Sequence, residues 1–165
     1  MRPQLRSQIS LIIPAPDDAD HAAARYAYGD WQYYAQARRN PIIHGLPALL
    51  WPTPAGVGRQ SLHRLPQPDP DDVMQLTRLG MSELHVIEVE RALAEALHLQ
   101  LEAHFAEHWD DRHVSEESRL TFVPHDDAYS LPHDSNRMVA RWLEQMDVQT
   151  RGPFWAVDWR VQEDE

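Results

Sequence analysis

One stretch of the sequence, residues 82–111, repeats apolar residues at the spacing of an α-helix. At 100° per residue its apolar members fall within one arc, while Glu88, Glu95 and Glu102 lie toward the other side. Ser82 is a favourable N-cap residue at its start. The pattern predicts one long amphipathic helix that acts as the spine of the fold. The arc comprises Val86, Glu90, Leu93, Ala94, Leu97, Leu101, Phe105 and Trp109, of which only Glu90 is charged.

The length of this helix bears on the oligomeric state. At 1.5 Å per residue it spans about 45 Å, which a chain of 165 residues cannot cover along its whole length. We therefore expect a homodimer in which the helix supplies the interface. The expected interface residues are Leu93, Leu97, Leu101, Phe105 and Trp109.

Patterns elsewhere predict the remaining elements of a single domain, residues 1–165. A β-branched run before Pro14 and a strict alternation after Pro153 are typical of strands. Asp17 and Asp18 before an alanine- and tyrosine-rich stretch indicate a helix that ends ahead of Pro41. The predicted strands are 8–13, 119–123 and 154–161, with 46–51 as an edge strand, and the other predicted helices are 19–39, 73–79 and 136–147.

These elements predict an α+β fold, in which three or four strands form a small, mostly antiparallel sheet. About three helices would pack on one side of it, the longest as the spine. Residues 40–72 are rich in proline and predict a loop or covering arm. Within it, Gly56-Val57-Gly58 predicts a turn, because no strand or third glycine accompanies it as a nucleotide-binding loop requires. Residues 162–165 predict a short acidic tail.

Composition limits the partners and the compartment. The chain has no cysteine and no apolar run long enough for a membrane span, so we expect a cytoplasmic protein that meets no membrane. All 15 basic residues are arginine, which is typical of a GC-rich bacterial or phage genome. Residues 100–165 carry 6 arginines against 15 acids, a net charge of −9. This excess argues against direct nucleic-acid binding. It either meets a protein partner with a basic surface or simply keeps the protein soluble.

The sharpest chemical pattern is His104-Phe105-Ala106-Glu107-His108. It places two imidazoles one helical turn apart, as zinc ligation requires, with a carboxylate beside them as a general base. These five residues resemble the motif of the inverted zinc peptidases, and the resemblance implies a zinc-dependent hydrolase that uses His104, Glu107 and His108. Histidines packed inside a core or an interface explain the same spacing without zinc.

A second group of histidines follows in a repeated tetrapeptide, aliphatic-Pro-His-Asp. It contains His125 with Asp126 and, eight residues later, His133 with Asp134. His125 and His133 are candidate further ligands for the metal of His104 and His108. The alternative is that Asp126 and Asp134 serve as turn and helix-cap residues.

Three functions are compatible with these patterns. The leading expectation is a non-enzymatic protein-binding factor without a cofactor: a small acidic regulator, inhibitor, immunity-type factor or assembly subunit that acts through its surface. It rests on the acidic C-terminal third, the tryptophans and the lack of a catalytic signature. The second is the zinc-dependent hydrolase. The third is a structural subunit of a phage or secretion assembly.

Overall fold

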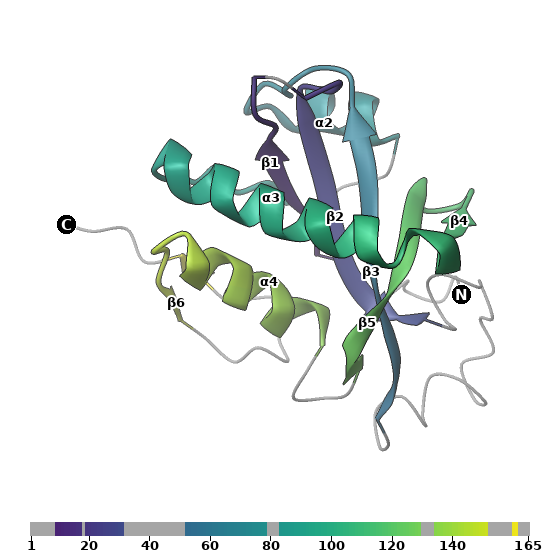
Figure 1. Ribbon diagram of the computed structural model, residues 1–165. Helices are drawn as coiled ribbons and strands as arrows, with labels where there is room; N and C mark the ends of the chain where they lie inside the picture. The colour runs from purple at the N-terminus through teal and green to yellow at the C-terminus, as the bar shows by residue number, and fades with distance from the viewer. Residues whose placement is uncertain are drawn as a thin grey trace, which may run out of the picture.

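The computed structural model confirms the α+β class, with one antiparallel sheet and helices packed against it (Figure 1). Both predicted features of the sheet, its small size and its antiparallel pairing, are present. The residues that the structure describes are 9–17, 19–31, 52–78, 83–129, 134–151 and 160–161.

The main sheet has five strands, each antiparallel to its neighbours. In spatial order they are β1 (Leu11–Pro14), β2 (Ala23–Asp30), β3 (Thr53–Leu62), β5 (Leu120–Tyr129) and β4 (His113–Ser115). The register of β3 sets Arg59 opposite Tyr26 of β2, and Val57 opposite Val123 of β5. A separate pair is formed by β6 (Thr150–Arg151) and β7 (Arg160–Val161).

Helices α3 (Arg91–Glu107) and α4 (Ser135–Gln145) lie side by side over one face of the sheet (Figure 1). The main core lies between them and the sheet. A shorter helix, α2 (Pro70–Thr77), contacts β3, and a 3-10 turn, η3 (Trp109–Asp111), follows α3. Among the described helices, none combines the length and apolar character that a bilayer crossing requires. The largest side chains of the main core include Tyr26, Tyr28, Leu97, Trp142 and Leu143.

The predicted spine helix exists, but it begins at Arg91 rather than at Ser82. Residues 83–90 form neither a helix nor a strand, and Ile87 and Val89 pack against the core while Val86 is 65% exposed. Two inward residues separated by one outward residue follow the period of an extended chain. The β-branched residues at 86, 87 and 89 also disfavour a helix, because their side chains lose rotamer freedom against the preceding turn.

The helix predicted over residues 19–39 is wrong over its first half, because residues 23–30 form β2. Ala24, Tyr26 and Tyr28 point into the core beneath the helices. Their spacing of two is the period of a strand. The alanines and tyrosines of this stretch fit the strand period as well as the helix period, so the sequence pattern did not distinguish the two. Residues 23–30 form a strand because they pair with β1 on one side and with β3 on the other. Residues 32–39 lie outside the described part of the chain.

The proline-rich arm predicted over residues 40–72 is also wrong in its second half, which contains the central strand β3. Its Gly56-Val57-Gly58 segment is not a turn. A Cβ atom on Gly58 would lie 2.7 Å from Cε1 of Phe122, and one on Gly56 would lie 2.7 Å from Cε3 of Trp31. The two glycines therefore let aromatic rings lie directly against the strand. The predicted edge strand 46–51 falls outside the described residues.

The C-terminal predictions agree better with the structure. The strand expected at 119–123 is β5, which continues past Pro124 to Tyr129, and the helix expected at 136–147 is α4. Asp134 is the N-cap of α4, where its carboxylate accepts a hydrogen bond from the Arg137 amide at 2.9 Å. Of the strand expected at 154–161, the structure describes only Arg160–Val161, and the tail 162–165 lies outside the described residues.

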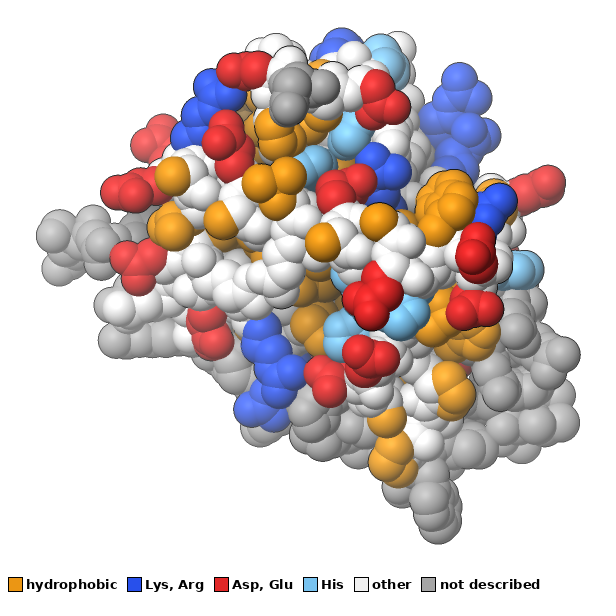
Figure 2. All heavy atoms as spheres, in the orientation of Figure 1, with side chains coloured by type: hydrophobic (Ala, Val, Ile, Leu, Met, Phe, Trp, Pro, Cys, Tyr) orange, Lys and Arg blue, Asp and Glu red, His pale blue; other side chains and the backbone are white. Residues whose placement is uncertain are grey.

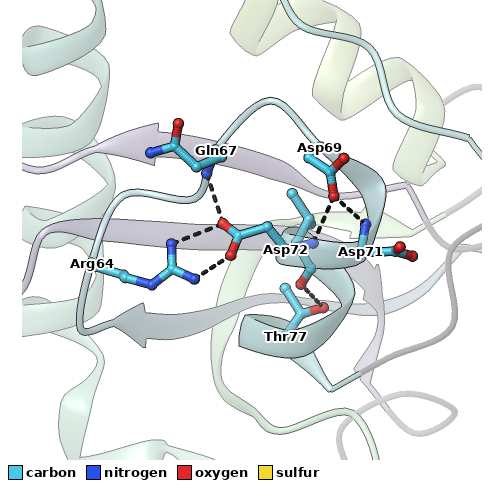
Figure 3. A network of polar contacts seen from close by, with 7 residues as sticks. Arg64, Gln67, Asp69, Asp71, Asp72 and Thr77 are labelled. Atoms are coloured by element: carbon cyan, nitrogen blue, oxygen red, sulfur yellow. Dashed lines mark hydrogen bonds and ion pairs between the residues drawn. The ribbon is translucent and has the colours of Figure 1, made fainter.

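Polar contacts hold the start of α2 (Figure 3). The Asp69 carboxylate accepts hydrogen bonds from the amides of Asp71 and Asp72, at 2.9 and 3.1 Å. Asp72 accepts from the Arg64 guanidinium and from the Gln67 amide, and these two donors lower the pKa of its carboxyl group. The predicted helix at 73–79 therefore begins earlier, with Pro70 in its first turn, where the missing amide hydrogen costs nothing.

We expect Asp69→Ala to lower the free energy of unfolding by about 1 kcal/mol, because two amides at the N-terminus of α2 lose their acceptor. Urea denaturation of the variant measures this loss. Asp71→Ala is the control, since no capping bond uses the Asp71 carboxylate. Equal stability of Asp69→Ala and the parent chain would contradict the capping role.

Candidate functional site

A polar network lies where α3 meets β2 and β3. Tyr26 of β2 donates a hydrogen bond from its hydroxyl to Oε1 of Glu102 at 2.6 Å, and the same hydroxyl lies 3.1 Å from Nδ1 of His98. Nε of Arg59, the cross-strand neighbour of Tyr26, is 2.7 Å from Oε1 of Glu102. His21 completes the group, with its ring centroid 5.6 Å from that of His98.

Burial sets the electrostatics of this network. Tyr26 is fully buried and His98 is 2% exposed, whereas the Glu102 side chain keeps 29% of its surface. Burial raises the pKa of Tyr26 most, followed by its hydrogen bond to Glu102 and the charge of that carboxylate. Burial likewise lowers the pKa of His98, against the opposing charge of Glu102. Tyr26 and His98 are therefore neutral at pH 7, and the network attaches α3 to the sheet through one carboxylate shared by Tyr26 and Arg59.

A second cluster joins the last turns of α3 to β5. The rings of His104 and His108 have centroids 4.6 Å apart, and His125 of β5 lies 5.2 Å from His104. Nε2 of His104 donates to the carbonyl oxygen of Pro124 at 2.9 Å. Nδ1 of His125 accepts a hydrogen bond from the Asp127 amide at 3.0 Å. The structure thus brings together three of the four histidines that the sequence suggested as metal ligands.

The hydrogen bond accepted by Nδ1 of His125 does not suit a metal ligand. Because Nδ1 of His125 accepts from a backbone amide, the neutral ring carries its proton on Nε2, and neither nitrogen has a free lone pair for a metal. Glu107, the expected general base, is exposed. Among the described residues no group of three or more histidine, aspartate or glutamate side chains is arranged to hold a metal ion. His133, the fourth expected ligand, lies outside the described residues.

The outer face of α3 carries apolar side chains that the sequence analysis did not single out. Exposed residues recur at alternating intervals of four and three, so they form one straight row along the helix. Figure 2 shows hydrophobic side chains in a row along α3, with acidic side chains on either side. We call this row the α3 face. It comprises Ala92, Ala96, Leu99, Ala103 and Ala106.

Trp109 extends the apolar surface at the C-terminal end of α3. Its side chain is 44% exposed, and the Arg112 guanidinium carbon lies 4.4 Å from the centre of its ring. Three exposed acids surround this end: Glu107, Asp110 and Asp111. The C-terminus of a helix carries the negative end of the helix dipole, so carboxylates there lower the stability of the free chain.

The expected dimer-interface residues divide between two places. Leu97, Leu101 and Phe105 are 2–4% exposed and pack in the core of the same chain. Leu93 is partly buried against that core, and only Trp109 is well exposed. The side of α3 that is available to another molecule is therefore opposite to the predicted one.

Comparison with protein-family models, with curated proteins and with solved structures finds no match. The fold defines the chain as a small α+β protein with a five-stranded antiparallel sheet and two helices layered on one face. Its function has to be argued from its own surface.

Proposed function

We propose that this protein is a non-enzymatic binding factor that docks a partner protein on the α3 face and Trp109. The observation that carries the proposal is the exposed apolar row that ends at Trp109. Leu99 is 59% exposed in the middle of this row, and the alanines around it allow another backbone to approach closely. Tryptophan and leucine in such a setting are the side chains that a partner buries first.

Charge supports a basic partner. Residues 107–117 carry five acids and one arginine, and the protein as a whole has a net charge of −11. A partner with lysine or arginine around an apolar centre would neutralise the acids at the end of α3 and relieve their repulsion with the helix dipole. Such complementarity accelerates encounter and makes affinity fall with added salt.

The same charges disfavour the expected homodimer. Pairing two copies of α3 would bring Glu95, Glu102 and Glu107 of each chain toward those of the other. Glu95 and Glu102 already pair with Arg91 and Arg59 of their own chain. These pairs offset part of the repulsion, but each copy still carries a net charge of −11, so a second copy is repelled where a basic partner is attracted. Light scattering distinguishes the two, because a dimer that persists at tens of micromolar would assign the α3 face to self-association.

The two alternative functions, a hydrolase and a structural subunit, have weaker support from the contacts of the described residues. The hydrolase reading needs His104, Glu107 and His108 to act together, whereas His104 faces β5 and Glu107 is exposed to solvent. No cofactor enters the proposal. A structural subunit of an assembly would use the same α3 face, and it differs from a regulator only in the partner that binds there.

We expect Leu99→Asp to weaken partner binding at least about 30-fold, since a central exposed leucine becomes a charge of the repelling sign. The probe is a synthetic helical peptide of about 20 residues with leucines along one face and lysines on both sides. Fluorescence anisotropy of the labelled peptide measures its affinity for the parent chain and for the variant.

Two controls make the result specific. Leu65→Asp places the same charge on a leucine that is 48% exposed outside α3, and it should leave the affinity unchanged. A peptide with glutamate in place of lysine should not bind. Equal binding of both peptides, or an affinity unchanged between about 50 and 500 mM salt, would contradict a basic partner.

A further inference from the structure

The histidine cluster between α3 and β5 contains a hydrogen bond that only a neutral imidazole can accept, at Nδ1 of His125. His104 and His108 lie one turn apart on α3, and His125 faces His104 from β5. The ring of Tyr28 meets the ring of His125 edge-on, at 5.3 Å between centroids. Side chains from β2, β5 and α3 thus meet at these imidazoles, beside the acids seen on this face in Figure 2.

Protonation of His125 is incompatible with the hydrogen bond that it makes. In the neutral ring Nδ1 accepts from the Asp127 amide. In the imidazolium both nitrogens carry hydrogen, so Nδ1 would present a donor to a donor and the bond would be lost. The new charge would also lie about 5 Å from the ring of His104, whose own Nε2–H is held by Pro124.

We propose that His104, His108 and His125 form an acid-sensitive clasp that holds the end of α3 against β5 while its imidazoles are neutral. Protonation of His125 opens the clasp. His108 is both the last cap of α3 and the residue before η3, which begins at Trp109. Opening therefore displaces the tryptophan, and acid weakens partner binding. This second consequence rests on the proposed function, whereas the opening itself does not.

Some charged groups around the cluster raise the pKa of His125 and others lower it. On β5, the charges of Asp127 and Asp126 favour a protonated His125. Arg141 of α4 pairs with Asp127 at 3.8 Å and offsets part of that effect. Burial is the largest influence, followed by the charge of His104, and together they lower the pKa of His125 below its ordinary value of 6.5.

The direction of the pH effect follows from this shift. A histidine whose pKa is lower in the closed form binds fewer protons there than in the open form. The closed form is therefore fully favoured above about pH 6.5 and loses stability as the pH falls from there toward the lowered pKa.

The test is NMR spectroscopy of the full chain with ¹⁵N labels. At about pH 7.5 the His125 ring should show the tautomer with hydrogen on Nε2, and the Asp127 amide should be protected from exchange. At about pH 5.5 its protection, corrected for intrinsic exchange, should fall severalfold and by about tenfold at most, because this pH lies one unit below the ordinary histidine pKa of 6.5 and one unit corresponds to a factor of ten. An unchanged protection factor, or hydrogen on Nδ1 at the higher pH, would overturn the clasp.

His125→Asn is the decisive variant. The asparagine side-chain oxygen can accept from the amide two residues on, as in an Asx turn, but it does not titrate. The variant should keep its protection at both pH values, while His113→Asn, at an exposed position on β4, should behave like the parent chain. If the pH effect persists in His125→Asn, another group causes it and the clasp is contradicted. If the pH effect in the parent chain disappears when a chelator is added, a bound metal ion causes it and the clasp is again contradicted.

The lysine-bearing peptide separates this inference from the proposed function. If both hold, its affinity falls in acid for the parent chain and not for His125→Asn. If the Asp127 amide responds to pH but the peptide does not bind at any pH, the clasp stands and the proposed function fails. If the peptide binds equally at both pH values, the clasp does not regulate the α3 face.

Discussion

Leu97→Asp is expected to unfold the protein, while Leu99→Asp, two residues further along the same helix, is expected to leave it folded. Leu97 is 2% exposed in the core between α3 and the sheet, whereas Leu99 is 59% exposed. A carboxylate at position 97 would be buried without a partner and would cost more than about 4 kcal/mol, a large share of the stability of a domain. Circular dichroism and urea denaturation of the two variants measure the difference.

This pair also tests which face of α3 points outward. If the long helix dimerised through its apolar arc, as its periodicity suggested, Leu97→Asp would yield a folded monomer. Light scattering on the variant distinguishes a folded monomer from an unfolded chain. A native spectrum from Leu97→Asp would contradict the placement of α3 against the sheet.

Phe122→Ala is expected to lower the free energy of unfolding by about 3–5 kcal/mol. Phe122 is fully buried on β5, and its ring lies against the backbone of Gly58 on β3. Truncation removes the ring opposite a glycine, which offers no side chain to close the space, so the cavity cannot collapse readily. Thermal and urea denaturation measure the loss, and a cost below about 1 kcal/mol would contradict this packing.

A variant of Gly58 tests the same contact from the other side. Gly58→Ala alone should cost about 1–3 kcal/mol, because its Cβ would meet the phenyl ring. In the Phe122→Ala background the added methyl enters vacated space, so its cost should shrink or reverse. The coupling between the two positions should therefore reach at least about 1 kcal/mol, and simple additivity would show that the two residues do not pack together.

Sequence periodicity predicted the helices whose apolar face meets the sheet. The main part of α3 and nearly all of α4 were predicted, because several turns of consistent spacing determine a helix face. The strand at β5 was predicted in its first half, where the run is β-branched and aromatic. Its continuation through Pro124 was not, since proline is tolerated there only because β4 pairs with β5 no further than Phe122.

The missed strands depend on distant partners. Ala24, Tyr26 and Tyr28 become a strand because β1 and β3 lie on both sides. A strand at the place of β1 was predicted, but β3 was not, and a local pattern does not show which strands pair. Gly56 and Gly58 look like turn residues in isolation. Only the rings of Trp31 and Phe122 reveal why a central strand has no side chain there.

The candidate site was predicted in part. The i, i+4 spacing of His104 and His108 correctly placed two imidazoles together, and His125 joined them through the antiparallel pairing of β5, which brings the chain back beneath α3. The chemical role of these histidines was harder to predict than their closeness in space. It depends on which ring nitrogens are occupied, and the hydrogen bonds of His104 to Pro124 and of His125 to Asp127 determine that. The α3 face was readable in the sequence as alanines and a leucine at intervals of four and three.

The order of strands along the chain has a consequence during synthesis. β3 pairs with β2 as soon as both have left the ribosome, but its other neighbour, β5, begins only at Leu120. At about 5–20 residues per second, roughly 3–12 s of translation separate the end of β3 from the start of β5. During that interval the nascent chain carries an open strand edge, and α3 and α4 do not yet cover Tyr26 and Tyr28. The half-made sheet is therefore the species most exposed to aggregation and most in need of a chaperone.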